Sequence, residues 1–216
     1  MQKKLFFMLL AFLALSFAAC DTKSSGKCHI TGSIPEKYNG KRIFLVPTVG
    51  DNRYNVDSVV IQNGKFEFNS DTLMLAEIRV DYHFRLGLQP LLLVVEPGEV
   101  TVRVDSISSA VGTPQNDSLN VWKERKQVHD QEYRQMIGII NELREKGDTA
   151  QANQLKPQAH DYHMAFKTYT RNLAKNMKEG ILHDFLSTLY PKTYKRMMPD
   201  STTVEYDADT NEPIHQ

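Results

Sequence analysis

Apolar and polar residues alternate with a period of two through the first half of the chain, between Cys28 and Thr113. Such alternation is typical of strands that bury one face and expose the other. The segments that follow this pattern span residues 28–34, 41–47, 56–62, 65–68, 75–82, 91–95, 100–104 and 108–112. Seven to eight short strands separated by turns predict an antiparallel β-sandwich or a partly open barrel.

Two of these segments carry more specific signals. Asn63-Gly64 stands between residues 56–62 and 65–68, and both residues tolerate the positive φ that a two-residue hairpin turn needs. Residues 91–95 are five apolar residues in a row, which is typical of a central strand covered on both faces.

The period changes to that of a helix after Thr113. Apolar residues then recur at three- and four-residue steps in two long stripes, joined by Gly147-Asp148. We expect Asn116 or Asp117 to cap the first helix and Pro157 to kink or restart the second. The two stripes predict a helical hairpin that packs apolar face against apolar face.

A short third helix is expected over residues 181–190, where Pro191 stops it. From Pro199 onward the chain has five acidic residues and no basic one, which predicts a disordered acidic tail. The fold class is therefore α+β. The expected units are a signal peptide (1–19), a lipidated cysteine and tether (20–27), a β-sandwich domain (28–114), a helical region (115–191) and the tail (192–216).

The first twenty residues have the pattern of a lipoprotein signal. Lys3 and Lys4 precede an uncharged apolar run of 15 residues, and Ala18-Ala19-Cys20 closes it. The run is shorter than the roughly 20 residues that a spanning helix needs. We therefore expect cleavage before Cys20 and acylation of its thiol, palmitate included, so that the lipid bilayer becomes a partner of the chain. The alternative is a plain secretory signal.

The charge balance argues against a nucleic-acid partner. The chain has 26 basic and 26 acidic residues, and removal of Lys3 and Lys4 leaves a net charge of −2. A nucleic-acid-binding domain usually carries a marked basic excess.

Cysteine usage bounds the redox chemistry. If Cys20 is lipidated, Cys28 is the sole thiol, and the chain has no Cys-x-x-Cys. Cys28 falls on the apolar face of the first expected strand, which predicts an inert buried thiol rather than a redox-active one.

Several short motifs occur in a fixed order along the chain. The motifs are Gly40-Lys41-Arg42-Ile43-Phe44-Leu45-Val46-Pro47, Asp57-Ser58-Val59-Val60, Asn63-Gly64-Lys65-Phe66-Glu67-Phe68, Glu96-Pro97-Gly98 and Gly112-Thr113-Pro114-Gln115-Asn116-Asp117. Together they resemble the domain-of-unknown-function family 4369. The resemblance implies a β-rich module of Gram-negative lipoproteins. Such a module often precedes a helical connector and a thioredoxin-like domain in membrane-anchored thiol-disulfide oxidoreductases.

The resemblance carries no catalytic residue, and the chain departs from the larger class. The 26 residues after Tyr190 contain no cysteine and are too few for a thioredoxin-like domain. We therefore expect the redox activity of that class to be missing here.

Three histidines are weak metal candidates. His160 and His163 lie one turn apart on the second expected helix, and His129 lies near the apolar stripe of the first. Zinc could bind three converging imidazoles, but such spacing arises easily by chance on amphipathic helices, where histidines face solvent or are hydrogen-bonded, so we expect no metal site. The sequence has no Gly-x-Ser-x-Gly and no phosphate-binding glycine loop, so we expect no catalytic residues and no cofactor.

An aspartate followed by Ser or Thr and then by an apolar residue or Thr occurs six times. The pattern resembles the O-glycosylation sequon of exported proteins from the same bacterial group, although Asp-Ser and Asp-Thr pairs also favour turns and caps. Thr72 and Ser201 are the expected acceptors.

Two functional hypotheses remain. The first is a non-enzymatic outer-membrane lipoprotein, periplasmic or surface-facing, whose β-sandwich binds a ligand or an envelope protein. The second is an accessory or truncated relative of a thiol-disulfide oxidoreductase, acting with a separate thioredoxin-like partner. The reactivity of Cys28 discriminates between them.

Overall fold

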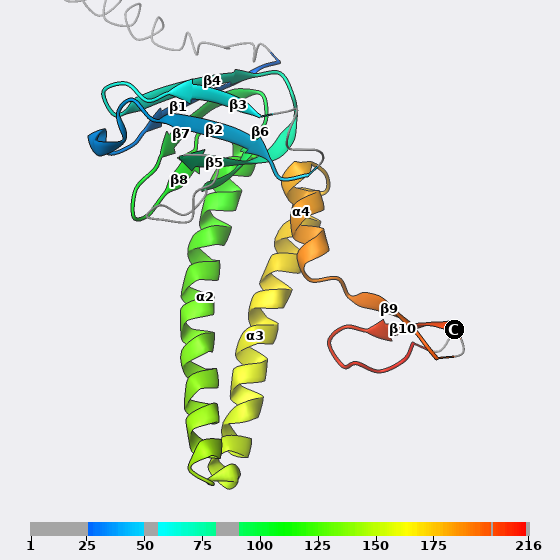
Figure 1. Ribbon diagram of the computed structural model, residues 1–216. Helices are drawn as coiled ribbons and strands as arrows, with labels where there is room; N and C mark the ends of the chain where they lie inside the picture. Colours follow the sequence, from blue (N-terminus) through cyan, green and yellow to red (C-terminus); the bar gives the residue numbers. More distant parts are fainter. Residues whose placement is uncertain (1–25, 50–55, 81–90, 200, 215–216) are drawn as a thin grey trace, which may run out of the picture.

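The structure is a computed structural model that describes residues 26–49, 56–80, 91–199 and 201–214. A β-sandwich stands at one end, and a long helical hairpin extends away from it (Figure 1). This confirms the α+β class, and the described strands form no closed barrel.

Eight strands build two four-stranded sheets. The strands are β1 (Cys28–Ser33), β2 (Arg42–Pro47), β3 (Asp57–Val60), β4 (Lys65–Ser70), β5 (Met74–Val80), β6 (Leu91–Val95), β7 (Gly98–Arg103) and β8 (Ser109–Val111), with a 3-10 turn, η1 (Glu36–Tyr38), after β1. One sheet has the order β4-β1-β7-β8 and the other β3-β2-β5-β6. Neighbouring strands are antiparallel except β1 and β7, which pair in parallel and so depart from the all-antiparallel expectation.

The core between the sheets is apolar. It is formed by 18 buried residues, and Ile30, Ile43 and Leu93 in it have no exposed surface. The core residues within the strands come from alternate positions, as the period of two requires. Burying such side chains contributes roughly 1.5–3 kcal/mol each, so the two sheets are held together mainly by removal of apolar surface from water.

The Asn63-Gly64 turn forms as its sequence predicts. Both residues have positive φ, 52° and 66°, and Gln62 and Lys65 exchange backbone hydrogen bonds across it. The turn joins β3 to β4, and these two strands belong to different sheets. It therefore carries the chain from one sheet of the sandwich to the other.

The helical hairpin consists of α2 (Pro114–Glu145) and α3 (Thr149–Met177), followed by α4 (Ile181–Leu189). A helix of 32 residues such as α2 is about 48 Å long. The turn between α2 and α3 includes Gly147, with φ +83°, and Asp148, whose side chain accepts a hydrogen bond from the Gln151 backbone. Helix α3 runs without interruption through Pro157.

The start of α2 corrects the expected cap. Thr113 is the N-cap residue and Pro114 the first helical residue, and neither Asn116 nor Asp117 caps the helix. The Asn116 amide instead donates to the Val94 carbonyl at 2.7 Å and accepts from the Val94 backbone N–H at 2.9 Å. Asn116 is fully buried and thus binds the outer edge of β6 as a neighbouring strand would.

A second contact strengthens this junction between sandwich and helices. Glu96 accepts hydrogen bonds from the backbone and the side-chain amide of Gln115, and Gln115 in turn accepts from the Leu182 backbone N–H at the start of α4. Trp122, Phe166 and Leu186 pack with Val94 in an apolar cluster beneath this network. The start of the hairpin is therefore fixed to the sandwich by both polar and apolar contacts.

The structure corrects the expectation of a disordered tail over residues 192–216. In its described part, β9 (Thr193–Met197) and β10 (Thr203–Asp207) form an antiparallel hairpin that projects from the helices (Figure 1). Asp209, one of its acidic residues, bonds to Lys167 and Arg171 of α3, so two cations on the helix offset the acidic excess. Stacked Tyr194 and Tyr206 rings, 5.5 Å apart, stabilise the pairing.

No helix in the described ranges combines the length and apolarity that crossing a membrane would require.

Candidate binding site between the two sheets

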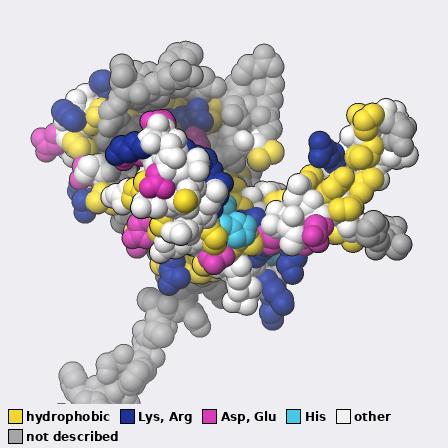
Figure 2. Space-filling model, turned by 90° about the horizontal axis from the view of Figure 1, so that it is seen from below, with side chains coloured by type: hydrophobic (Ala, Val, Ile, Leu, Met, Phe, Trp, Pro, Cys, Tyr) yellow, Lys and Arg dark blue, Asp and Glu magenta, His cyan; other side chains and the backbone are white. Residues whose placement is uncertain are grey.

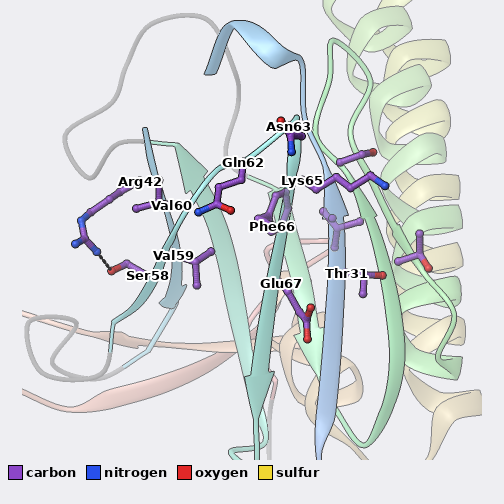
Figure 3. Close-up of a pocket in the computed structure, with 14 residues that line it drawn as sticks. Thr31, Arg42, Ser58, Val59, Val60, Gln62, Asn63, Lys65, Phe66 and Glu67 are labelled. Carbon is purple, nitrogen blue, oxygen red and sulfur yellow. Dashed lines mark hydrogen bonds between the residues drawn. The ribbon is translucent and has the colours of Figure 1, made fainter. Parts of the chain in front are cut away.

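A hollow of about 1030 Å³ opens where β3 and β4 diverge from the Asn63-Gly64 turn (Figure 3). β3 is the outer strand of one sheet and β4 the outer strand of the other. In the described part of the chain, each therefore has one edge that pairs with no other strand. Figure 3 shows Ser58 and Val59 of β3 on one side of the hollow and Glu67 of β4 and Thr31 of β1 on the other.

An aromatic ring forms part of the floor. Phe66 stands directly opposite Gly32 in the β1–β4 pairing, and a Cβ at position 32 would lie 1.9 Å from the Phe66 ring. Only glycine leaves room for the ring there, so the ring lies against the β1 backbone. Phe66 also makes an edge contact with Phe68, with 5.9 Å between ring centroids, and this contact fixes its orientation.

Charged and hydroxyl side chains form the rim. Arg42 of β2 donates to the Ser58 hydroxyl at 3.1 Å, and the exposed Lys65 stands at the start of β4. Glu67 is the acidic residue of the rim. The rim therefore combines two cations with one anion.

Glu67 is already engaged by a histidine on β1. The His29 ring lies between two carboxylates, with Nε2 2.8 Å from Glu67 and Nδ1 2.6 Å from Glu99. Hydrogen bonds to Glu67, and next to Glu99, favour the imidazolium and raise the pKa of His29. The same bond lowers the pKa of Glu67. Among the described residues, no ion pair joins Glu67 to either rim cation.

This arrangement offers several groups that could bind a ligand. Strand edges carry backbone N–H and C=O groups that can pair with an added strand, and the Phe66 ring offers an apolar contact between them. The hydroxyls of Thr31 and Ser58 add hydrogen-bonding groups. Among the described residues that line the hollow, none is a histidine or a cysteine that could act as a base or a thiol nucleophile.

Cys28 lies in the core of the sandwich, with 2% of its surface exposed. Burial raises the pKa of its thiol, although a hydrogen bond from the Glu96 backbone opposes the shift. A buried thiol of raised pKa is largely protonated and slow to react.

The structure brings two of the three candidate metal ligands together. His129 Nε2 and His163 Nδ1 are 3.2 Å apart across the helical hairpin, and His129 Nδ1 is 3.0 Å from Asp130. His129 is buried against Phe166, with ring centroids 4.3 Å apart. His160 lines a groove that His163 also lines, and no hydrogen bond joins it to either of the other two histidines in the described part of the chain. Among the described residues, no three His, Cys, Asp or Glu side chains are placed to hold a metal ion.

The two expected glycosylation sites are exposed. Thr72 follows β4, and its hydroxyl lies 3.5 Å from the Asp71 carboxylate. Ser201 lies in the β9–β10 turn with a positive φ of 66°. Both hydroxyls are on turns, where a modifying enzyme could reach them, and glycosylation itself stays a prediction.

Cys20, which is expected to be lipidated, lies outside the described residues. The hollow was not foreseen from the sequence. Gly32 within an otherwise regular strand pattern is its one sequence signal, because an isolated glycine in a strand indicates a close approach by another group.

Comparison with known proteins gives one match. Residues 28–119 match the family model described as domain of unknown function (DUF4369). The matched range covers all eight strands of the sandwich and the first residues of α2. Searches of curated proteins and of solved structures found no match.

Proposed function

We propose that the chain, whose residues 28–119 match the DUF4369 family model, is a non-enzymatic, membrane-anchored binding protein whose ligand occupies the hollow between β3 and β4. The observation that carries the proposal is the hollow itself. Two strand edges border it, an aromatic ring lies on its floor, and two cations stand at its rim.

The chemistry of the hollow favours an extended polypeptide segment as the ligand. A segment that adds a strand along β3 or β4 would satisfy backbone groups at the edge and could place a side chain on Phe66. Arg42 and Lys65 favour acidic or polar side chains in that segment. The partner would then be another protein of the cell envelope.

The anchor in this proposal is Cys20, which stands at the end of the apolar leader. An acylated Cys20 would place the sandwich close to a membrane surface, because only seven residues separate it from Cys28. A span of seven residues reaches at most about 25 Å when fully extended. We propose the outer membrane of a Gram-negative bacterium as the location.

Photo-crosslinking in cells tests the proposed site. A benzoylphenylalanine at Val60, which lines the hollow, is compared with one at Val111, a matched valine on the outer strand β8. The exposed fractions of the two side chains are similar, 43% and 37%. We expect a discrete adduct with one envelope protein from position 60 and none from position 111. Equal labelling from both positions, or none from either, would refute a binding hollow.

The burial of Cys28 supports binding over the redox hypothesis, and thiol labelling tests this choice. In the folded chain we expect Cys28 to react with a maleimide at least a hundredfold more slowly than an exposed cysteine introduced as Thr72→Cys. Similar rates at the two positions would favour an accessory redox role instead.

A further inference from the structure

A groove on the helical hairpin, near its tip, collects side chains that can bind an anion. Asn141 and Arg144 of α2 and Lys156 and His160 of α3 line it, and its volume is about 200 Å³. We call it the basic groove. It is distinct from the hollow of the sandwich, since none of its residues lies before the helices. Figure 2 looks onto this end of the molecule, where both basic and acidic side chains lie around the tip of the hairpin.

The charges of the basic groove have no partner within the described part of the chain. There, the side chains of Arg144, Lys156 and His160 take part in no ion pair or hydrogen bond. No acidic residue lines the groove either. Two other cations of the hairpin, by contrast, are paired: Lys146 is 2.5 Å from Glu142, and Lys167 is 2.5 Å from Asp209. Such unpaired charges, gathered at one groove, attract an anion.

The floor of the basic groove is apolar and aromatic. Ile140 and Ala159 are each 3% exposed, and the rings of Tyr133 and His163 stack at 4.9 Å. A floor of low polarity strengthens the electrostatic field of the cations above it. Burial, and then the nearby His129, Lys167 and His160 side chains, lower the pKa of His163.

The size of the groove and the geometry of its hydrogen-bond donors limit which ligands it can hold. A volume of about 200 Å³ holds a phosphate group with a few carbon atoms, but not a drug-sized ligand, whose pockets start at roughly 300 Å³. A guanidinium fork binds two phosphate oxygens at once, and a lysine adds a point charge. The Asn141 amide and the His160 ring can supply further hydrogen bonds.

We propose that the basic groove binds a small phosphate-bearing molecule, with its phosphate on Arg144 and Lys156 and its carbon skeleton on Tyr133 and Ile137. The phosphate could belong to a soluble metabolite or to a lipid headgroup. The shared chemistry is a phosphate monoester or diester on a short polar skeleton.

Calorimetric titration of the full chain tests the proposal with defined probes. Glycerol 3-phosphate is compared with glycerol, and inorganic phosphate is titrated alone. A parallel sedimentation assay compares vesicles of phosphatidylglycerol and phosphatidylcholine with vesicles of phosphatidylcholine only. Saturable binding of glycerol 3-phosphate but not of glycerol supports a soluble ligand, and selective binding to the phosphatidylglycerol vesicles supports a headgroup.

Variants then locate the binding. Arg144→Gln and Lys156→Gln remove one charge each from the groove, and Lys175→Gln removes an exposed charge elsewhere on α3. We expect each groove variant to weaken binding about tenfold, the loss typical of one hydrogen bond to a charged group, and Lys175→Gln to leave it within twofold. Because all three residues are exposed, the melting temperatures of the variants should match that of the parent.

Two results would overturn the proposal. One is the absence of saturable binding to any phosphate probe and to both vesicle types. The other is an equal loss for Lys175→Gln and the groove variants, which would mean that binding follows net charge alone.

Discussion

The sandwich and the helical hairpin bury different kinds of side chains. In the described part of the chain, four polar residues are buried, and all of them lie at the start of the hairpin or within it: Thr113, Asn116, His129 and Thr170. The core of the sandwich is formed by apolar residues. Towards the tip, the hairpin buries only Ile140, Ala152 and Ala159.

This difference in buried side chains shows which interactions stabilise each region. Apolar burial is non-directional, so it stabilises the sandwich without requiring any single contact. Buried polar groups must be paired with good geometry, because an unpaired one costs about 1–3 kcal/mol. Besides the apolar cluster around Val94, the position of the hairpin therefore depends on specific hydrogen bonds between Asn116 and Val94. Within the hairpin, Trp122 Nε1 donates to the Thr170 hydroxyl at 3.0 Å.

The largest effect is expected in the sandwich core. Phe68 is 1% exposed, and Phe68→Ala removes a large side chain that its neighbours cannot replace. We expect a loss of about 4 kcal/mol in the free energy of unfolding, measured by urea denaturation. Leu73→Ala, at a position 62% exposed, is the control and should change stability by less than about 0.5 kcal/mol. Similar losses for both variants would mean that the sandwich lacks the dry core described.

A smaller effect is expected at the junction. Asn116→Ala leaves the N–H and C=O of Val94 without partners, which should cost about 3 kcal/mol. Asn120→Ala is the matched control on the same helix, since the Asn120 amide bonds only to Glu124 in a solvent-exposed pair. Hydrogen exchange should show faster exchange at the start of α2 in Asn116→Ala but not in the sandwich core. Uniform acceleration in both regions would show that they unfold as one unit.

The smallest effect is expected in the pH dependence of stability, where one histidine in each region can be compared. The raised pKa of His29 means that its stabilising contribution is complete below about pH 6.5, while its two glutamates are ionised, and is lost as the pH rises through the raised value. The lowered pKa of His163 has the opposite effect on the pH dependence of stability. The unfolded chain binds that proton more readily, so the folded state loses stability as the pH falls below about 6.5.

Urea denaturation of His29→Gln and His163→Gln at pH 5.5 and pH 8.5 separates the two signs. The parent should exceed His29→Gln in stability by more at pH 5.5 than at pH 8.5. Relative to His163→Gln, the parent should be less stable at pH 5.5 than at pH 8.5. The same sign for both histidines would contradict the environments assigned to them.

How far the sequence predicts the structure also differs between the regions. In the sandwich, period-two alternation and the Asn63-Gly64 turn are local signals, and the strands form where they were expected. The parallel pairing of β1 with β7 was not foreseen, because strand order depends on contacts between distant segments. The hollow between β3 and β4 was not predicted either, for the same reason, since it exists only where two sheets diverge.

In the hairpin, the apolar stripes predicted the helices, but two residues were misread. Asn116 is a residue type favoured at N-caps, yet its amide binds Val94, and this competing partner is remote in sequence. Asp209 belongs to an acidic run typical of disorder, yet Arg171 and Lys167 pair with it. In both cases a distant partner decides the role of a polar residue, and no local pattern reports it.

The most direct test of the proposed anchored binding protein concerns Cys20. Cells expressing the parent chain or Cys20→Ser are labelled with a clickable palmitate analogue and separated into membrane and soluble fractions. We expect the parent chain to carry the label and sediment with the membranes, and Cys20→Ser to lose both properties while remaining folded. A Cys20→Ser chain that sediments with the membranes to the same extent as the parent would contradict the account.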